Sequence, residues 1–218
     1  MFWFLYYMLL LPSKMFMPVK VIGKKNYNKK QNYVIVCNHR SAFDPIIMNF
    51  KFKKRIRFIA KKELWKGKEK SYLYDNILGC IAIDRENGLT LSTTKTVFDI
   101  LKNNECLGIF PEGTRKDAET NIEVKDGACL FAIKSKKPVL PCFIVKKQKL
   151  FRKNILIIGE PFELSEFYDK KLDKECLSQA GEVLANKIMS LKENYYKDLD
   201  EKQLKKKKHK LSKTINKE

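Results

Sequence analysis

His39 and Asp44 have the residue types and the spacing for acid–base chemistry, with four residues between them. They belong to the segment Asn38-His39-Arg40-Ser41-Ala42-Phe43-Asp44-Pro45, which directly follows an apolar run. A turn would bring the Asp44 carboxylate to one imidazole nitrogen and leave the other facing a substrate. The carboxylate would then fix the tautomer of His39 and stabilise the imidazolium formed when His39 takes a proton from a substrate hydroxyl. A second interpretation stays open, in which Asp44 only caps a helix and His39 is a loop residue.

A second polar segment, Phe110-Pro111-Glu112-Gly113-Thr114-Arg115, also directly follows an apolar run. Proline ends a strand, and Gly113 lets the backbone approach a ligand closely. Backbone amides and the guanidinium of Arg115 are suited to holding a phosphate. Only six of the 45 basic residues are arginines, so an arginine at the end of a strand suggests a need for its bidentate geometry. The alternative is an ordinary loop in which Glu112 and Arg115 form a surface ion pair.

The elements that must position these segments are indicated by short apolar runs alternating with helical stretches. Runs rich in Val, Ile or Phe are typical of strands buried on both faces, and their alternation with helices predicts an α/β domain with a largely parallel sheet. Ligands of such sheets bind at the carboxyl ends of the strands, where both polar segments lie. We expect strands at Tyr33–Cys37, Arg55–Ala60, Ile81–Asp84, Cys106–Phe110, Val139–Val145 and Ile155–Ile158, and helices at Pro45–Phe52, Leu89–Lys102, Gly127–Ser135 and Lys174–Tyr196. Asp44 is expected to be the N-cap of the first helix, with Pro45 at its first position.

The net charge of +20 predicts attraction to an anionic partner, which is nucleic acid, an acidic bilayer or a phosphate-bearing substrate. No acidic residue precedes Asp44, and a second basic block spans Lys205–Lys210. The six cysteines show neither a CxxC pair nor metal-ligand spacing, and most lie in apolar runs. We therefore expect packed free thiols in a reducing compartment.

The N-terminal segment MFWFLYYMLLLP carries no charge before Lys14. As a helix it would be about 20 Å long, shorter than the roughly 30 Å hydrocarbon core of a bilayer. Its aromatic residues and the lysines that follow favour a helix lying in one leaflet, although a helix packed on the core stays possible. We divide the chain into an apolar helix and basic linker (1–30), a catalytic domain (31–197) and a basic, disordered tail (198–218).

Four segments in order resemble the 1-acylglycerol-3-phosphate acyltransferases and their wider glycerolipid acyltransferase superfamily. Asn38 to Asp44 is similar to the first block of that family, and Lys61-Lys62-Glu63-Leu64 to the short basic segment after it. Gly79 to Arg85 resembles the second block, and Phe110 to Arg115 resembles the third. The fourth block is similar to Lys125, Gly127 and Ala128 together with Pro138-Val139-Leu140-Pro141. The similarity spans residues 33–145. Lys116 stands where many relatives have Ser, and the apolar N-terminus is shorter than in many relatives.

The resemblance implies transfer of a fatty-acyl group from acyl-CoA or acyl carrier protein to the sn-2 hydroxyl of lysophosphatidic acid, which forms phosphatidic acid in phospholipid biosynthesis. It implies that His39 is the general base and that Asp44 orients it. Residues implied to bind the acceptor are Lys61, Arg85, Glu112, Gly113, Thr114 and Arg115. It implies no metal and no cofactor. We expect backbone amides near the first block to stabilise the oxyanion, and an enzyme associated with the cytoplasmic face of the cell membrane.

Two alternatives remain at this point. One is an acyltransferase of the same superfamily that acts on another lysolipid. The other is a basic module without chemistry that binds anionic membrane or nucleic acid. The sequence has no recognition-helix motif, zinc finger or RNA-binding aromatic signature, so we expect no nucleic acid partner. Charge alone also does not explain four ordered blocks.

Overall fold

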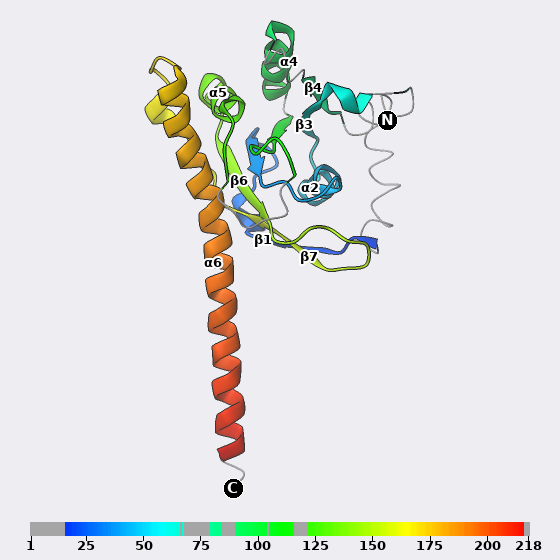
Figure 1. The fold of residues 1–218 in the computed structure, drawn as a ribbon, viewed down its shortest axis with the longest axis vertical. Coiled ribbons are helices and arrows are strands. Elements are labelled where there is room, and N and C mark those ends of the chain that lie inside the picture. The colour runs from blue at the N-terminus through cyan, green and yellow to red at the C-terminus, as the bar shows by residue number, and fades with distance from the viewer. Residues whose placement is uncertain are drawn as a thin grey trace.

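The strands of this chain form one mixed sheet in the computed structural model, which describes residues 16–65, 67, 79–83, 90–103, 105–115 and 122–215. Within these residues the sheet has seven strands in the order β1-β7-β6-β2-β5-β3-β4 (Figure 1). The strands are β1 (Val19–Ile22), β2 (Val34–Cys37), β3 (Ile56–Lys61), β4 (Ile81–Ile83), β5 (Cys106–Ile109), β6 (Val139–Ile144) and β7 (Asn154–Ile158).

The five strands β6, β2, β5, β3 and β4 run parallel, so their carboxyl ends share one edge of the sheet. β7 returns antiparallel to β6, and β1 pairs parallel to β7 at the border of the sheet. The prediction of a mixed, largely parallel sheet is therefore confirmed. β1 was not predicted.

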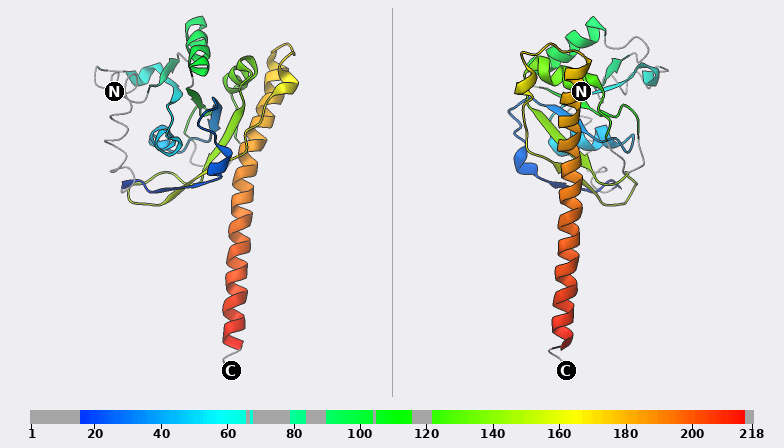
Figure 2. Two further views of the ribbon diagram at one scale, coloured as in Figure 1. Left: turned by 180° about the vertical axis from the view of Figure 1, so that it is seen from behind. Right: turned by 60° about the vertical axis from the view of Figure 1, so that its left-hand side comes forward.

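Helices cover both faces of the sheet (Figures 1 and 2). Alternate residues of β2 supply the two cores: Val34 and Val36 face one cluster, and Ile35 and Cys37 face the other. The first cluster includes buried residues of α4 (Leu91–Lys102), α5 (Asp126–Ser135) and α6 (Lys174–Ile215). The second includes buried residues of α2 (Asp44–Phe52). Short 3₁₀ turns, η1, η2 and η4, span Lys24–Asn26, Lys62–Trp65 and Ser165–Phe167.

α6 differs from its prediction. It does not end near Tyr196 but continues to Ile215, so a helix replaces the predicted disordered tail, and its distal half extends away from the rest of the chain (Figure 2). The predicted apolar helix at Met1–Pro12 lies outside the described residues, and the predicted domain boundaries stay predictions. Within the described residues no helix is both long and apolar enough to cross a membrane.

Candidate active site

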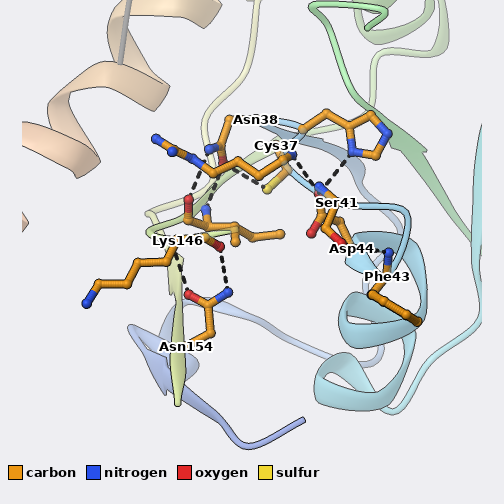
Figure 3. Close-up of polar contacts among 10 residues, drawn as sticks. Cys37, Asn38, Ser41, Phe43, Asp44, Lys146 and Asn154 are labelled. Carbon is orange, nitrogen blue, oxygen red and sulfur yellow. Dashed lines mark hydrogen bonds and ion pairs between the residues drawn. The ribbon is translucent and has the colours of Figure 1, made fainter. Parts of the chain in front are cut away.

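Asp44 is the centre of the turn that joins β2 to α2. Its Oδ2 atom lies 2.9 Å from His39 Nδ1 and accepts backbone N–H groups from Arg40 and Ser41, each at 2.7 Å (Figure 3). The Asp44 side chain is fully buried, and its Oδ1 atom has no hydrogen-bond partner among the described residues. The turn is closed by the Asp44 N–H, which donates to the Ser41 carbonyl, and by the Phe43 N–H, which donates to Ser41 Oγ.

This arrangement corrects one expectation and confirms another. Asp44 is the first residue of α2 and Phe43 is its N-cap, so the carboxylate binds amides that precede the helix rather than amides inside it. The expected contact between the Asp44 carboxylate and one imidazole nitrogen is present. Because Oδ2 is an acceptor, Nδ1 carries the proton of the neutral ring and Nε2 presents its lone pair. His39 is thus oriented as a base.

The imidazole ring of His39 is also held by aromatic stacking. It lies on Phe110 with ring centroids 4.0 Å apart and an interplanar angle of 13°. Phe110 in turn stacks on Phe58 of β3, with centroids 5.0 Å apart. Phe110, directly after β5, therefore supports the ring that Asp44 orients and is itself backed by Phe58 of the neighbouring strand.

Asn38 anchors the start of this turn to the end of β6. Its side-chain amide donates to the Ile144 carbonyl at 3.0 Å and its Oδ1 accepts the Ile144 N–H at 2.7 Å (Figure 3). Asn38 is only 3% exposed. These two hydrogen bonds between the buried Asn38 side chain and the backbone of Ile144 fix the turn to the sheet. Removing the Asn38 side chain would leave the N–H and C=O groups of Ile144 unpaired.

The Phe110–Arg115 segment forms a second turn on the same edge. The Gly113 N–H donates to the Phe110 carbonyl, and the Lys125 N–H donates to the Pro111 carbonyl. Gly113 has φ of +67°, and a Cβ there would lie 3.0 Å from Lys125 Cε. The positive φ favours glycine here, and the missing side chain lets Lys125 pass close to the backbone. Lys125 is also the N-cap residue of α5, whose N-terminus faces this turn.

The charges of two carboxylates act on Cys37 at the end of β2. The pKa of the Cys37 thiol lies well above its ordinary value, mainly because the thiol is buried and next because the Cys142 thiol is close. The charges of Asp44 and Glu112 raise that pKa further, so both carboxylates lie within electrostatic reach of Cys37. Glu112 is buried, at 8% exposed.

The structure places most of the predicted acceptor residues on the edge that carries His39. Lys61 is the last residue of β3, and Glu112, Gly113, Thr114 and Arg115 follow β5. Lys61, Thr114 and Arg115 are exposed. Arg85 lies outside the described residues.

Two features of the site were not predicted. The stacking of Phe110 on His39 depends on the β2–β5 register, which no local pattern reveals. The passage of Lys125 over Gly113 was signalled only by the conformational freedom of glycine. The expected oxyanion donors are also corrected in part, because the amides of Arg40, Ser41, Phe43 and Asp44 are all engaged within the turn.

All six cysteines are buried free thiols, as predicted. Among the described residues no group of three or more His, Cys, Asp or Glu side chains is arranged to hold a metal ion.

Comparisons with known proteins agree with this geometry. The model of the family described as Acyltransferase matches residues 18–145. The 1-acyl-sn-glycerol-3-phosphate acyltransferase of Bacillus subtilis is 34% identical over 79% of this chain and 87% of its own length. That of Streptococcus pneumoniae is 31% identical over 75% of this chain and 60% of its own. The crystal structure of the 1-acyl-sn-glycerophosphate (LPA) acyltransferase PlsC from Thermotoga maritima aligns with a TM-score of 0.62 at 25% identity, covering 87% of this chain and 80% of that one. The chain therefore belongs to the acyltransferase family, as an enzyme of the 1-acyl-sn-glycerol-3-phosphate acyltransferase group.

Proposed function

We propose that this enzyme transfers a fatty-acyl group from a thioester donor to the sn-2 hydroxyl of 1-acylglycerol-3-phosphate, forming phosphatidic acid. The observation that carries the proposal is the buried Asp44 carboxylate at 2.9 Å from His39 Nδ1, on the edge of the sheet where ligands of such folds bind. The names of the relatives agree with this acceptor.

In the proposed mechanism, His39 Nε2 removes the proton of the acceptor hydroxyl as its oxygen attacks the thioester carbonyl. The Asp44 charge stabilises the imidazolium that forms. When the tetrahedral intermediate collapses, the carbon–sulfur bond breaks and the departing thiolate takes the proton from His39. The products are the ester and a free thiol, and His39 returns to its neutral form.

The acceptor phosphate is proposed to lie at the turn after β5. Arg115 supplies a bidentate guanidinium and Lys125 a second cation, and the positive end of the α5 dipole points to the same place. Lys61 adds a charge from the neighbouring strand β3. Glu112, Gly113 and Thr114 shape the turn, and Arg85 is proposed to line the same site.

We propose that the donor is acyl-CoA or acyl carrier protein and that the enzyme works at the cytoplasmic face of the cell membrane. A net charge of +20 attracts both the anionic donors and an anionic bilayer. Deletion of Met1–Ser13 should weaken binding to anionic vesicles while preserving activity on a detergent-dispersed acceptor, as co-sedimentation and rate assays can show.

The activity test is release of free thiol from acyl-CoA, and from acyl carrier protein, in the presence of a panel of lysolipids. We expect lysophosphatidic acid to give the highest kcat/KM, and His39→Ala to lower kcat by about 10²–10⁴-fold with unchanged circular dichroism. His209 is the only other histidine, so His209→Ala is the matched control. A faster rate with another lysolipid would reassign the acceptor. A His39→Ala variant with wild-type rates would exclude the mechanism.

A further inference from the structure

The loop between β6 and β7 presents two large apolar side chains to solvent at its tip. Leu150 is 55% exposed and Phe151 is 68% exposed. Phe151 also has φ of +60°, a backbone conformation that is sterically unfavourable for a bulky residue. Apolar side chains exposed to this extent contribute little buried area to the folded chain, and unfavourable backbone conformations that persist often mark functional surfaces.

Basic residues surround this apolar tip. The loop contains five of them, all exposed, and no acidic residue: Lys146, Lys147, Lys149, Arg152 and Lys153. Beside the loop, a cavity of about 500 Å³ is lined in part by Lys20, Lys146 and Lys153, and its other lining residues carry no negative charge. Exposed apolar side chains flanked by cations suit a partner with an apolar interior and anionic groups at its surface.

Buried amides hold the loop in a fixed shape. Asn154 Nδ2 donates to the Lys146 carbonyl at 2.7 Å, and Asn154 Oδ1 accepts the Lys146 N–H (Figure 3). Asn154 Nδ2 also donates to Gln148 Oε1 at 3.1 Å. Gln148 Nε2 donates to the carbonyls of Lys149 and Arg152. Both amides are at most 5% exposed. Hydrogen bonds from two buried side chains therefore fix the backbone of the loop that carries the apolar tip.

The loop is also joined to the chain leaving the N-terminal segment. The Phe151 N–H donates to the Phe16 carbonyl at 2.6 Å, and the two rings pack edge to face with centroids 5.2 Å apart. Phe16 comes shortly after the uncharged sequence at residues 1–12. β6 ends on the edge of the sheet that carries His39, because Asn38 binds Ile144.

We propose that the β6–β7 loop docks the enzyme on an anionic lipid bilayer, with Leu150 and Phe151 inserted among the acyl chains and the surrounding lysines and Arg152 on the lipid phosphates. The placement agrees with the proposed lipid acceptor, but the contact itself does not require catalysis. Apolar insertion combined with cationic contacts is the general mode of interfacial binding.

A fluorescent probe in the loop tests this contact apart from any contribution of residues 1–15. Because all six native cysteines are buried, Leu150→Cys should be labelled selectively by an environment-sensitive nitrobenzoxadiazole reagent. Vesicles of equal parts phosphatidylglycerol and phosphatidylcholine should raise its emission by about threefold or more, as in transfer to an apolar medium. Leu91→Cys is the matched control, because Leu91 is 91% exposed at the start of α4, which lies away from the loop (Figure 1).

Two further measurements, one with heparin and one with a double variant, identify the partner. Heparin, a polyanion without acyl chains, should leave the emission at position 150 unchanged, whereas a rise with heparin would indicate a polyanion site instead. In the full chain, Leu150→Asn with Phe151→Asn should lower the partition onto anionic vesicles by about tenfold or more. Asparagine tolerates the left-handed conformation at position 151, so folding is preserved.

The charge contribution has its own matched pair. Lys149→Gln, Arg152→Gln and Lys153→Gln together should weaken vesicle binding by about tenfold or more. Lys134→Gln, Lys171→Gln and Lys174→Gln remove the same charge from exposed positions outside the loop and should have little effect.

The proposal fails if the label at position 150 does not respond while the protein co-sediments with vesicles, or if both triple variants behave alike. Activity on a detergent-dispersed acceptor reports on the proposed function separately, and should persist in every loop variant.

Discussion

Replacing Asp44 by Asn removes one negative charge from the site and leaves every hydrogen bond of its neighbours available. All three donors that reach Asp44, from His39, Arg40 and Ser41, converge on the single atom Oδ2. The amide oxygen of Asn can occupy that position and accept the same three bonds. The –NH₂ group would then take the place of Oδ1, which has no hydrogen-bond partner among the described residues. The variant therefore keeps the tautomer of His39 and loses only the charge.

The expected effect on rate follows from the charge that is lost. At a separation of about 4 Å and an effective dielectric constant near 20, a carboxylate and an imidazolium attract by about 4 kcal/mol. In the proposed mechanism the transition state forms the imidazolium, so Asp44→Asn should lower kcat by about 10³-fold. The buried –NH₂ group lacks an acceptor, which should cost about 1–3 kcal/mol and lower the melting temperature by roughly 2–12 °C.

The assay is thiol release with saturating acyl-CoA and lysophosphatidic acid, measured beside thermal unfolding. Asp173→Asn is the matched control, because Asp173 Oδ1 caps the Cys176 N–H at the start of α6 and Asn caps equally well. A variant at position 44 that keeps more than about a tenth of the wild-type rate would refute an electrostatic role for Asp44. A rate loss that is fully recovered by lowering the assay temperature would assign the residue to folding alone.

Three further outcomes follow from the structure. Arg115→Lys should raise the KM for the acceptor and leave the KM for the donor nearly unchanged, because the charge remains while the bidentate geometry is lost; a selective rise for the donor would relocate the phosphate. Gly108→Ala should lower both the melting temperature and kcat, since its Cβ would lie 2.5 Å from Phe58 Cε1 and displace the ring stacked on Phe110; unchanged kcat would show that the stack is dispensable. The native thiols should not react with Ellman's reagent until the chain is denatured, because burial raises the pKa of Cys129 to about 12 and that of Cys142 further; titration of native and denatured protein counts them.

The central strands were predictable because burial on both faces leaves a continuous apolar run. Val34–Cys37 is buried at every position, and each predicted strand was found with its ends within one residue of the prediction. β1 escaped prediction because it is a border strand of only four residues, with Lys20 between half-buried valines, so it resembles the basic linker around it. Its pairing with β7 is a long-range contact that composition cannot show.

Neither the length of α6 nor the detailed geometry of the site could be predicted from the sequence. Beyond Tyr196 the helix has no sustained apolar face, and Lys, Glu and Leu hold it through intrinsic helix propensity. At Asp44 the sequence Asp-Pro marks a helix start but does not distinguish the N-cap from the first helical residue. That difference of one residue decides whether the carboxylate binds amides within the helix or those of Arg40 and Ser41. The residue types of the proposed catalytic pair were visible in the sequence, whereas their geometry depended on the fold.

A single buried side chain connects the candidate active site with the proposed membrane contact. Asn38 precedes His39 and binds both backbone groups of Ile144, which lies two residues before Lys146, the first basic residue of the β6–β7 loop. The base and the loop therefore belong to one rigid edge. An interfacial segment typically enters a bilayer by only about 5–10 Å, into the boundary between headgroups and acyl chains. An enzyme held there by the loop would meet the hydroxyl of the lysolipid without withdrawing the acyl chain into water.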